Sequence, residues 1–173
     1  MIRKIVPVTD PVLRKKSKPV KKIDKKIKSL INDLKDTLLS QKDPEGVGLA
    51  APQIGKNIRL FAMKPKKDIT IVINPKIVNI EDDEGVKKDP KTLEGCLSLP
   101  RYYGPLIRPR KIAIKYLSEE GKKITKTFKG FPAQVVQHEI DHLDGILFVD
   151  HLLEKKQPLF EYKNGGWHEV ELV

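Results

Sequence analysis

The sequence contains a single cysteine, Cys96, among 173 residues. One cysteine excludes an internal disulfide framework of the kind that stabilises small secreted domains. It suits a reducing compartment, where a free thiol persists as a metal ligand or a nucleophile. The sequence therefore predicts a cytoplasmic location.

Long hydrophobic runs are also missing. The longest apolar runs, such as residues 71–73 and 146–149, are far shorter than the ~20 residues that a membrane-spanning helix requires. The N-terminus begins with basic residues but has no apolar stretch of signal-peptide length and no small-residue cleavage site. We therefore expect neither a membrane segment nor secretion.

Acidic residues are in the minority. The chain has 34 Lys and Arg against 23 Asp and Glu, a formal net charge of +11, which favours acidic partners such as nucleic acid. The sequence lacks the alternation of basic and aromatic residues that marks a base-stacking surface. Short basic clusters at residues 14–16, 21–22, 25–26 and 122–123 are more often solvated surface than a dedicated binding site.

The rest of the composition is that of a folded globular protein, with 39% apolar and 33% charged residues. A chain of this length can bury one substantial core but has little room for two. Apolar residues three and four positions apart predict an amphipathic helix over residues 23–39, capped by Asp24 and ended by residues 43–46. We therefore expect a single domain over residues 1–173.

The later segments show mainly β patterns. Residues 118–121 and 164–166 are turn signals between alternating arms, and Pro132 suits the first turn of a helix. In chain order, the patterns predict buried strands over residues 58–63 and 69–73, a break at 74–75 and a surface loop over 81–90. They then predict a hairpin over 111–128, a second helix over 132–145 and a final hairpin over 159–172.

The second helix carries the strongest chemical signal. His138 and His142 are four residues apart, so their imidazoles lie on one helical face and can share a metal ion. Glu139 lies about 100° around the helix from His138, where its carboxylate can reach a metal-bound water without being a ligand. Because the same pattern arises by chance in helices, it does not establish a metal site by itself.

A catalytic zinc-like site needs three protein ligands and an open position. Cys96 can supply a thiolate, and the preceding Gly95 allows close backbone approach, although a lone cysteine is more often a small buried hydrophobe. The segment 46–55 is rich in small residues, includes the amide of Gln53, and lacks the lysine of a phosphate-binding loop. Two interpretations of this segment stay open. Either its backbone closely approaches another chemical group, or it packs as a tight loop beneath a helix.

Three alternatives stay open at this level. A zinc protease could take its third ligand from Glu154 or Glu161, but this leaves Cys96 without a role. A copper electron-transfer site would need Met63 as axial ligand and would leave Glu139 idle. An RNA-binding protein would owe its function to charge alone, which the glycine-rich segment argues against.

Taken together, the motifs resemble those of the peptide deformylase family, in the same order: residues 46–53, 94–98 and 137–142. The resemblance extends to residues 10–14, Asn74-Pro75 and 142–148, and covers roughly residues 1–153. Residues 154–173 are a less diagnostic tail that we expect to form a hairpin.

This resemblance implies an α+β fold, with antiparallel sheets packed around a central metal-binding helix and the first helix outside. It implies an amidohydrolase that removes the formyl group from the initiator methionine of newly synthesised polypeptides, by attack of a metal-bound hydroxide on the formyl carbon. One divalent metal ion per chain is expected, with Fe²⁺ as the native ion and Ni²⁺, Co²⁺ or Zn²⁺ as possible occupants. The expected partners are N-formylmethionyl nascent chains and, through the basic surface, the ribosome; a monomer is favoured.

The resemblance also implies roles for particular residues. Glu139 would move protons, while the Gln53 amide and the Leu97 backbone N–H would hold the oxyanion. Glu94 is expected to pair with Arg108 or Arg110. The expected metal ligands are Cys96, His138 and His142, and the residues expected to bind the substrate are Val47, Gly48, Phe131 and Val135.

Overall fold

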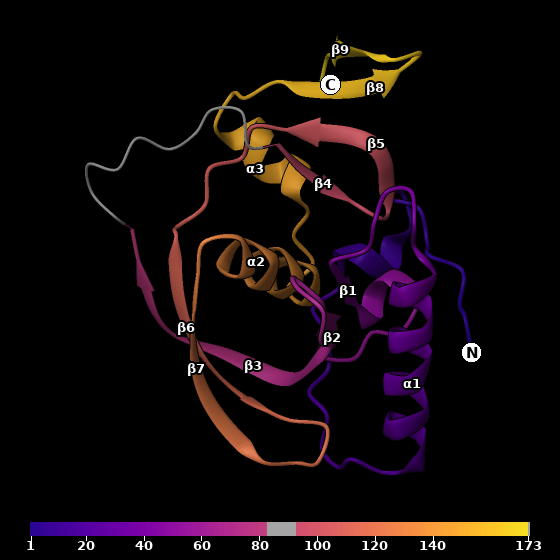
Figure 1. Cartoon of the computed structure of the whole chain (residues 1–173), viewed down its shortest axis with the longest axis vertical. Helices are drawn as coiled ribbons and strands as arrows, with labels where there is room; N and C mark the ends of the chain where they lie inside the picture. Colours follow the sequence, from indigo (N-terminus) through magenta and orange to yellow (C-terminus); the bar gives the residue numbers. More distant parts are fainter. Residues whose placement is uncertain (83–92, 173) are drawn as a thin grey trace.

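A computed structural model describes residues 1–82 and 93–172 as two antiparallel sheets and three α-helices (Figure 1). The first sheet has the order β1-β2-β3-β6-β7, with strands Gly48–Ala50, Leu60–Met63, Thr70–Glu81, Lys111–Leu117 and Lys123–Lys129. The second has the order β4-β5-β8-β9, with strands Glu94–Cys96, Leu99–Gly104, Leu159–Lys163 and Gly166–Val170. The helices are α1, Lys25–Ser40; α2, Phe131–Leu143; and α3, Phe148–Glu154, with short 3-10 helices η1, Pro11–Arg14, and η2, Ala51–Ile54.

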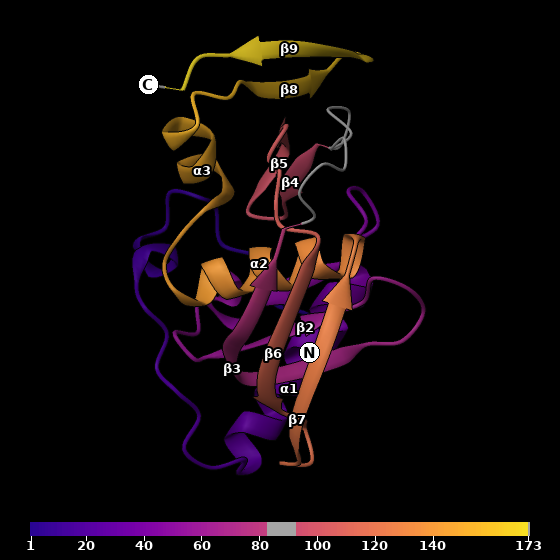
Figure 2. The ribbon, with the colours of Figure 1, turned by 90° about the vertical axis from the view of Figure 1, so that its left-hand side faces the viewer.

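Helix α2 lies between the two sheets, as the perpendicular view in Figure 2 shows. Its apolar residues Ala133, Val136 and Ile140 recur at helical spacing and pack with Phe61 and Ile112 of the first sheet. Full burial of a Val, Ile or Phe side chain contributes roughly 1.5–3 kcal/mol to the stability of the folded state. The predicted α+β fold around a central helix is therefore confirmed, and the packing leaves another face of α2 free to carry polar groups.

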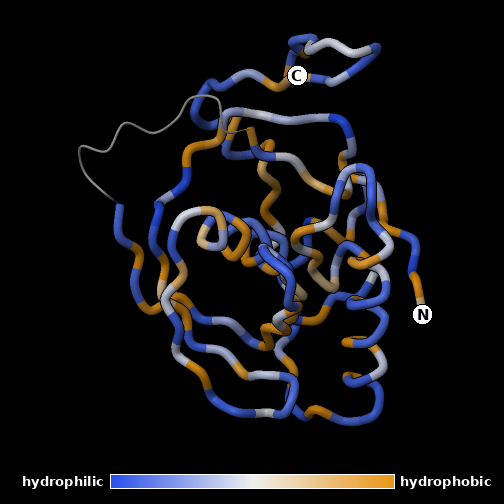
Figure 3. Tube along the Cα trace, viewed as in Figure 1, coloured by the Kyte–Doolittle hydropathy of each residue, from blue (hydrophilic) through white to orange (hydrophobic). Residues whose placement is uncertain are grey.

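Helix α1 lies outside the first sheet, as expected. The Asp24 side chain caps it by accepting a hydrogen bond from the Ile27 N–H at 3.0 Å, so the helix begins at Lys25, two residues after the predicted start. Figure 3 shows hydrophobic residues recurring on the side of α1 that faces the sheet; among them, Leu34 and Leu38 are fully buried. The predicted amphipathic helix and its cap are thus confirmed.

The expected break at Asn74-Pro75 is wrong, because β3 runs through both residues. The pairing of β3 with β6 shifts register between Ile73 and Lys76, and Asn74 has a φ of +50°. Its side chain donates to the Val20 carbonyl and accepts from the Val20 N–H, both at 2.8 Å. Proline has no backbone N–H to donate to the neighbouring strand, and a β-bulge at this point accommodates it within a continuous strand.

The two predicted hairpins are present as β6–β7 and β8–β9. The predicted loop over residues 81–90 is wrong at Glu81, because this residue is the last of β3. Residues 83–90 of the predicted loop lie outside the described part of the chain. Within residues 1–82 and 93–172, no helix has the length and apolar character to cross a membrane.

Candidate metal centre and active site

Two histidines and the cysteine meet between α2 and β4. The Nε2 atoms of His138 and His142 lie 3.2 Å apart, and the Sγ of Cys96 lies 3.2 Å from the Nε2 of His142. All three donor atoms lie within 4.8 Å of one another. One thiolate and two imidazoles at this spacing suit a tetrahedral site with one open position.

The other ring nitrogen of His138 faces a carboxylate. Glu94 Oε1 lies 2.6 Å from His138 Nδ1, which assigns the proton to Nδ1 and leaves the lone pair of Nε2 for a metal ion. Glu94 also accepts two hydrogen bonds from the Arg108 guanidinium, both at 2.7 Å. This bidentate pair holds the carboxylate, and through it the imidazole, in one orientation.

Arg108 keeps Glu94 ionised inside the protein. Burial alone would raise the pKa of Glu94, but the hydrogen bonds from Arg108 and His138 outweigh it and lower the pKa to about 2. Arg108 also pairs with Asp141 at 2.9 Å. Of the two arginines that the sequence offered, Arg108 rather than Arg110 is the partner of Glu94; the contact with His138 was not predicted.

Glu139 lies against the first strand of the first sheet. A Cβ atom at Gly48 would overlap the Glu139 carboxylate, so a residue without a side chain is required there. Burial raises the pKa of Glu139 to about 7, and its Oε2 is buried with no hydrogen-bond partner among the described residues. A carboxylate with a near-neutral pKa can accept and release a proton.

Gln53, in η2, is buried beside the cysteine. Its Oε1 accepts a hydrogen bond from the Ala50 N–H at 2.9 Å, which orients the amide. The Nε2 then faces Cys96 Sγ at 3.5 Å and Ser98 Oγ at 3.3 Å. A donor fixed in this way is suited to a developing negative charge next to the thiolate.

Comparison with known proteins identifies the family. The family model of polypeptide deformylases matches residues 2–158. The chain belongs to this family. Peptide deformylase 2 of Clostridium acetobutylicum is 45% identical over 153 residues, 88% of this chain and 97% of that protein. The protein is accordingly a hydrolase that removes formyl groups from polypeptides.

Solved deformylase structures share the fold. The crystal structure of the peptide deformylase from Thermus thermophilus matches with a TM-score of 0.78 at 41% identity, over 90% of this chain and 88% of that one. The peptide deformylase from Thermotoga maritima matches with a TM-score of 0.77 at 38% identity, over 87% of this chain and 97% of that one.

The pocket of this deformylase encloses about 240 Å³ and includes the metal-ligand candidates Cys96 and His138 in its wall. His142 is not among the lining residues and is 1% exposed. Phe131 is half exposed and so stands at the rim. The residues predicted from the sequence that line the pocket are Val47, Gly48, Gln53, Cys96, Leu97, Phe131, Val135, His138 and Glu139.

Further lining residues of the deformylase pocket were missed, among them Glu45, Tyr103 and Gln134. The Gln134 amide donates to Glu94 at 3.3 Å, and its position one helical turn before His138 could have revealed it. Tyr103 reaches the pocket only through the pairing of β4 with β5, which no local pattern predicts.

Proposed function

We propose that this deformylase removes the formyl group from the N-terminal methionine of newly made polypeptides, with Cys96, His138 and His142 holding one divalent metal ion. The observation that carries the proposal is the convergence of these three donor atoms within 4.8 Å, in the wall of a pocket that also contains a buried carboxylate.

The residues present fit a metal ion. Two imidazole nitrogens 3.2 Å apart repel each other unless a proton or a cation lies between them, and His138 already uses its other nitrogen toward Glu94. When bound, the ion supplies Lewis-acid chemistry, since it makes water a stronger nucleophile at neutral pH and polarises a carbonyl oxygen. We propose Fe²⁺ as the native ion. Ni²⁺, Co²⁺ and Zn²⁺ also suit one thiolate and two imidazoles.

Glu139 is the proposed proton carrier. As water adds to the formyl carbon, the carboxylate accepts a proton from it and then delivers that proton to the methionine nitrogen. The carbon–nitrogen bond breaks, and the products are formate and a free amine. Burial supports this role because it raises the pKa of Glu139 to about 7, close to the pH at which the group must both accept and donate.

Gln53 and Leu97 are the proposed partners of the formyl oxygen as it becomes negatively charged. The Gln53 amide nitrogen faces Cys96 Sγ, and Leu97 directly follows the cysteine in the pocket wall. We propose that the methionine of the substrate is bound by four residues that border the same pocket: Val47, Gly48, Phe131 and Val135. The apolar side chains among them would exclude water from the methionine side chain.

Gln53→Ala is expected to lower kcat by about 10²–10³-fold, the usual loss for one oxyanion donor. Steady-state kinetics on a formylmethionyl peptide measures this loss. Gln53→Met keeps the volume but has no N–H donor, so it separates lost hydrogen bonding from lost packing. If Gln53→Met turns over at the wild-type rate, the amide does not stabilise the oxyanion.

Metal analysis combined with peptide assays tests the proposed function. We expect about one divalent ion per chain, and formate release from formylmethionyl peptides but no cleavage of unformylated ones. Internal peptide cleavage would favour a zinc protease, and a redox-active copper ion would favour electron transfer. A preparation that binds RNA but neither binds metal nor releases formate would exclude the proposed enzyme.

We further propose that the protein acts as a cytoplasmic monomer, with residues 1–173 as one domain, and that its basic surface docks on the ribosome. Five lysines border a surface groove at the start of α1: Lys21, Lys22, Lys25, Lys26 and Lys56. Ribosomal RNA is dense in phosphate, and nascent chains emerge at the ribosome. Lysines gathered on one groove would bind its phosphates and release counterions.

Ribosome affinity is therefore expected to fall steeply as salt rises, while turnover of a free formyl-peptide changes far less. Cosedimentation across a salt series measures this. Reversing Lys21, Lys22, Lys25 and Lys26 to Glu should abolish binding at low salt. The matched control reverses four exposed lysines of the β6–β7 hairpin: Lys115, Lys122, Lys123 and Lys126. If the groove reversal leaves binding unchanged, the groove has no docking role.

A further inference from the structure

Three aromatic rings from three strands gather on one face of the second sheet. The ring of Trp167, on β9, meets Tyr103, on β5, nearly edge-on with centroids 5.4 Å apart. Trp167 also lies 4.9 Å from the ring of Tyr162, on β8. Trp167 is 51% exposed and Tyr162 is 44% exposed, so the cluster, called here the aromatic surface, is open to solvent.

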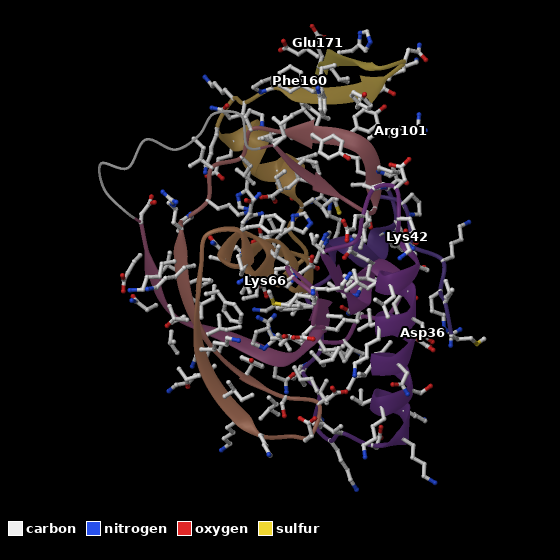
Figure 4. All side chains as sticks on the ribbon, viewed as in Figure 1. Asp36, Lys42, Lys66, Arg101, Phe160 and Glu171 are labelled. Carbon is white, nitrogen blue, oxygen red and sulfur yellow. The ribbon has the colours of Figure 1, made fainter. Side chains whose placement is uncertain are left out.

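Strand register explains why these rings share a face. Residues directly opposite each other in paired strands point the same way. Tyr103 is opposite Gly95 of β4 on one side and Phe160 of β8 on the other. Phe160 and Tyr162 are two residues apart on β8 and so point to the same face, and Trp167 is opposite Tyr162. Figure 4 labels Phe160 on β8, beside β5.

The other face of the sheet packs inward. A Cβ atom at Gly104 would overlap Leu152 of α3, and Leu159 is buried in the cluster that contains Leu152. The aromatic surface is therefore on the outward face of the sheet, and the opposite face is the one that packs against α3.

The aromatic surface is continuous with the active-site pocket. Tyr103 lines that pocket, and its ring would be 2.6 Å from a Cβ atom at Gly95, the residue before Cys96. An extended peptide advances about 3.3 Å per residue. A peptide whose formyl group lies beside Cys96 can therefore bring one of its next few side chains onto Tyr103 and Trp167.

The hairpin that carries Trp167 lies beyond the family match, which ends at residue 158. We propose that Tyr103 and Trp167 form a subsite for an aromatic side chain within the first three residues after the formylmethionine. The inference rests on the proposed function and specifies the substrate class: the enzyme selects nascent chains with an aromatic residue near the N-terminus. Edge-to-face contact between rings supplies the attraction.

The subsite is tested with formyl-Met-Ala-Ala-Ala and three variants that place Phe at the second, third or fourth position. One Phe position is expected to raise wild-type kcat/KM about 3- to 10-fold over Ala, mainly through KM, as an added aromatic pair would. In Trp167→Ala this ratio should fall to about one, and Trp167→Phe should restore part of it. His168→Ala, the adjacent exposed residue on β9, should keep the wild-type ratio.

A second measurement does not depend on a variant. Trp167 is the only tryptophan of the chain, so intrinsic fluorescence reports on the subsite directly. Titration with the unformylated product peptide should change the emission when the peptide carries Phe at the preferred position, and not when it carries Ala.

The outcomes separate the two proposals. If the wild type releases formate from none of the peptides, the proposed function fails. If it deformylates all four equally, or if Trp167→Ala keeps the preference for Phe, the subsite is wrong and the rings only stabilise the hairpin. Unchanged tryptophan emission with the Phe peptide would contradict the subsite in the same way.

Discussion

Cys96→Ser is expected to abolish most deformylation and to strip the native metal from the purified protein. A serine hydroxyl is a harder donor than a thiolate and does not ionise near neutral pH, so the site loses one of its three ligands. Among the described residues the metal-ligand cluster consists of Cys96, His138 and His142, so the variant keeps two of its three ligands. Activity can persist when excess metal is added.

Elemental analysis and turnover of a formylmethionyl peptide check this result. His168→Ala provides the control, because this histidine lies on β9, is exposed and is not part of the metal-ligand cluster. A Cys96→Ser protein with full metal content and wild-type turnover would show that Cys96 is not a ligand, and the proposed site would have to be abandoned.

Glu139→Gln is expected to keep the metal and to lower kcat by about 10²–10⁴-fold, the range for loss of general acid–base catalysis. An amide has the shape of the carboxylate, so it still fits against Gly48, but it cannot accept a proton from water. The buried Oε2 of Glu139, which lacks a partner among the described residues, is the atom best suited to that transfer.

Metal content and kcat, measured on the same preparation, test the role of Glu139. Glu45→Gln is the matched control, since Glu45 borders the same pocket but its side chain is 74% exposed. This control should retain wild-type turnover. If Glu139→Gln loses its metal instead, the carboxylate is a ligand and not the proton carrier.

Much of the fold could be predicted because its signals are local. The spacing of apolar residues predicted α1, Asp24 predicted its cap, and the turn at residues 118–121 predicted the β6–β7 hairpin. These features depend on contacts between near neighbours in the chain, where helical and strand periodicities act directly. Asn74-Pro75 misled the prediction because a bulge, set by pairing with β6, keeps β3 continuous.

The chemistry of the site could be read from the chain before folding: the pair His138 and His142, the carboxylate of Glu139, the lone thiol of Cys96 and the family to which they belong. The orientation of these groups, in contrast, depends on contacts between distant parts of the fold. The contact of Glu94 with His138 spans 44 residues, and the approach of Trp167 to Tyr103 depends on the pairing of β5 with β8 and of β8 with β9. Such contacts arise from strand register and from layers packing together, which link segments distant in sequence and leave no trace in local periodicity.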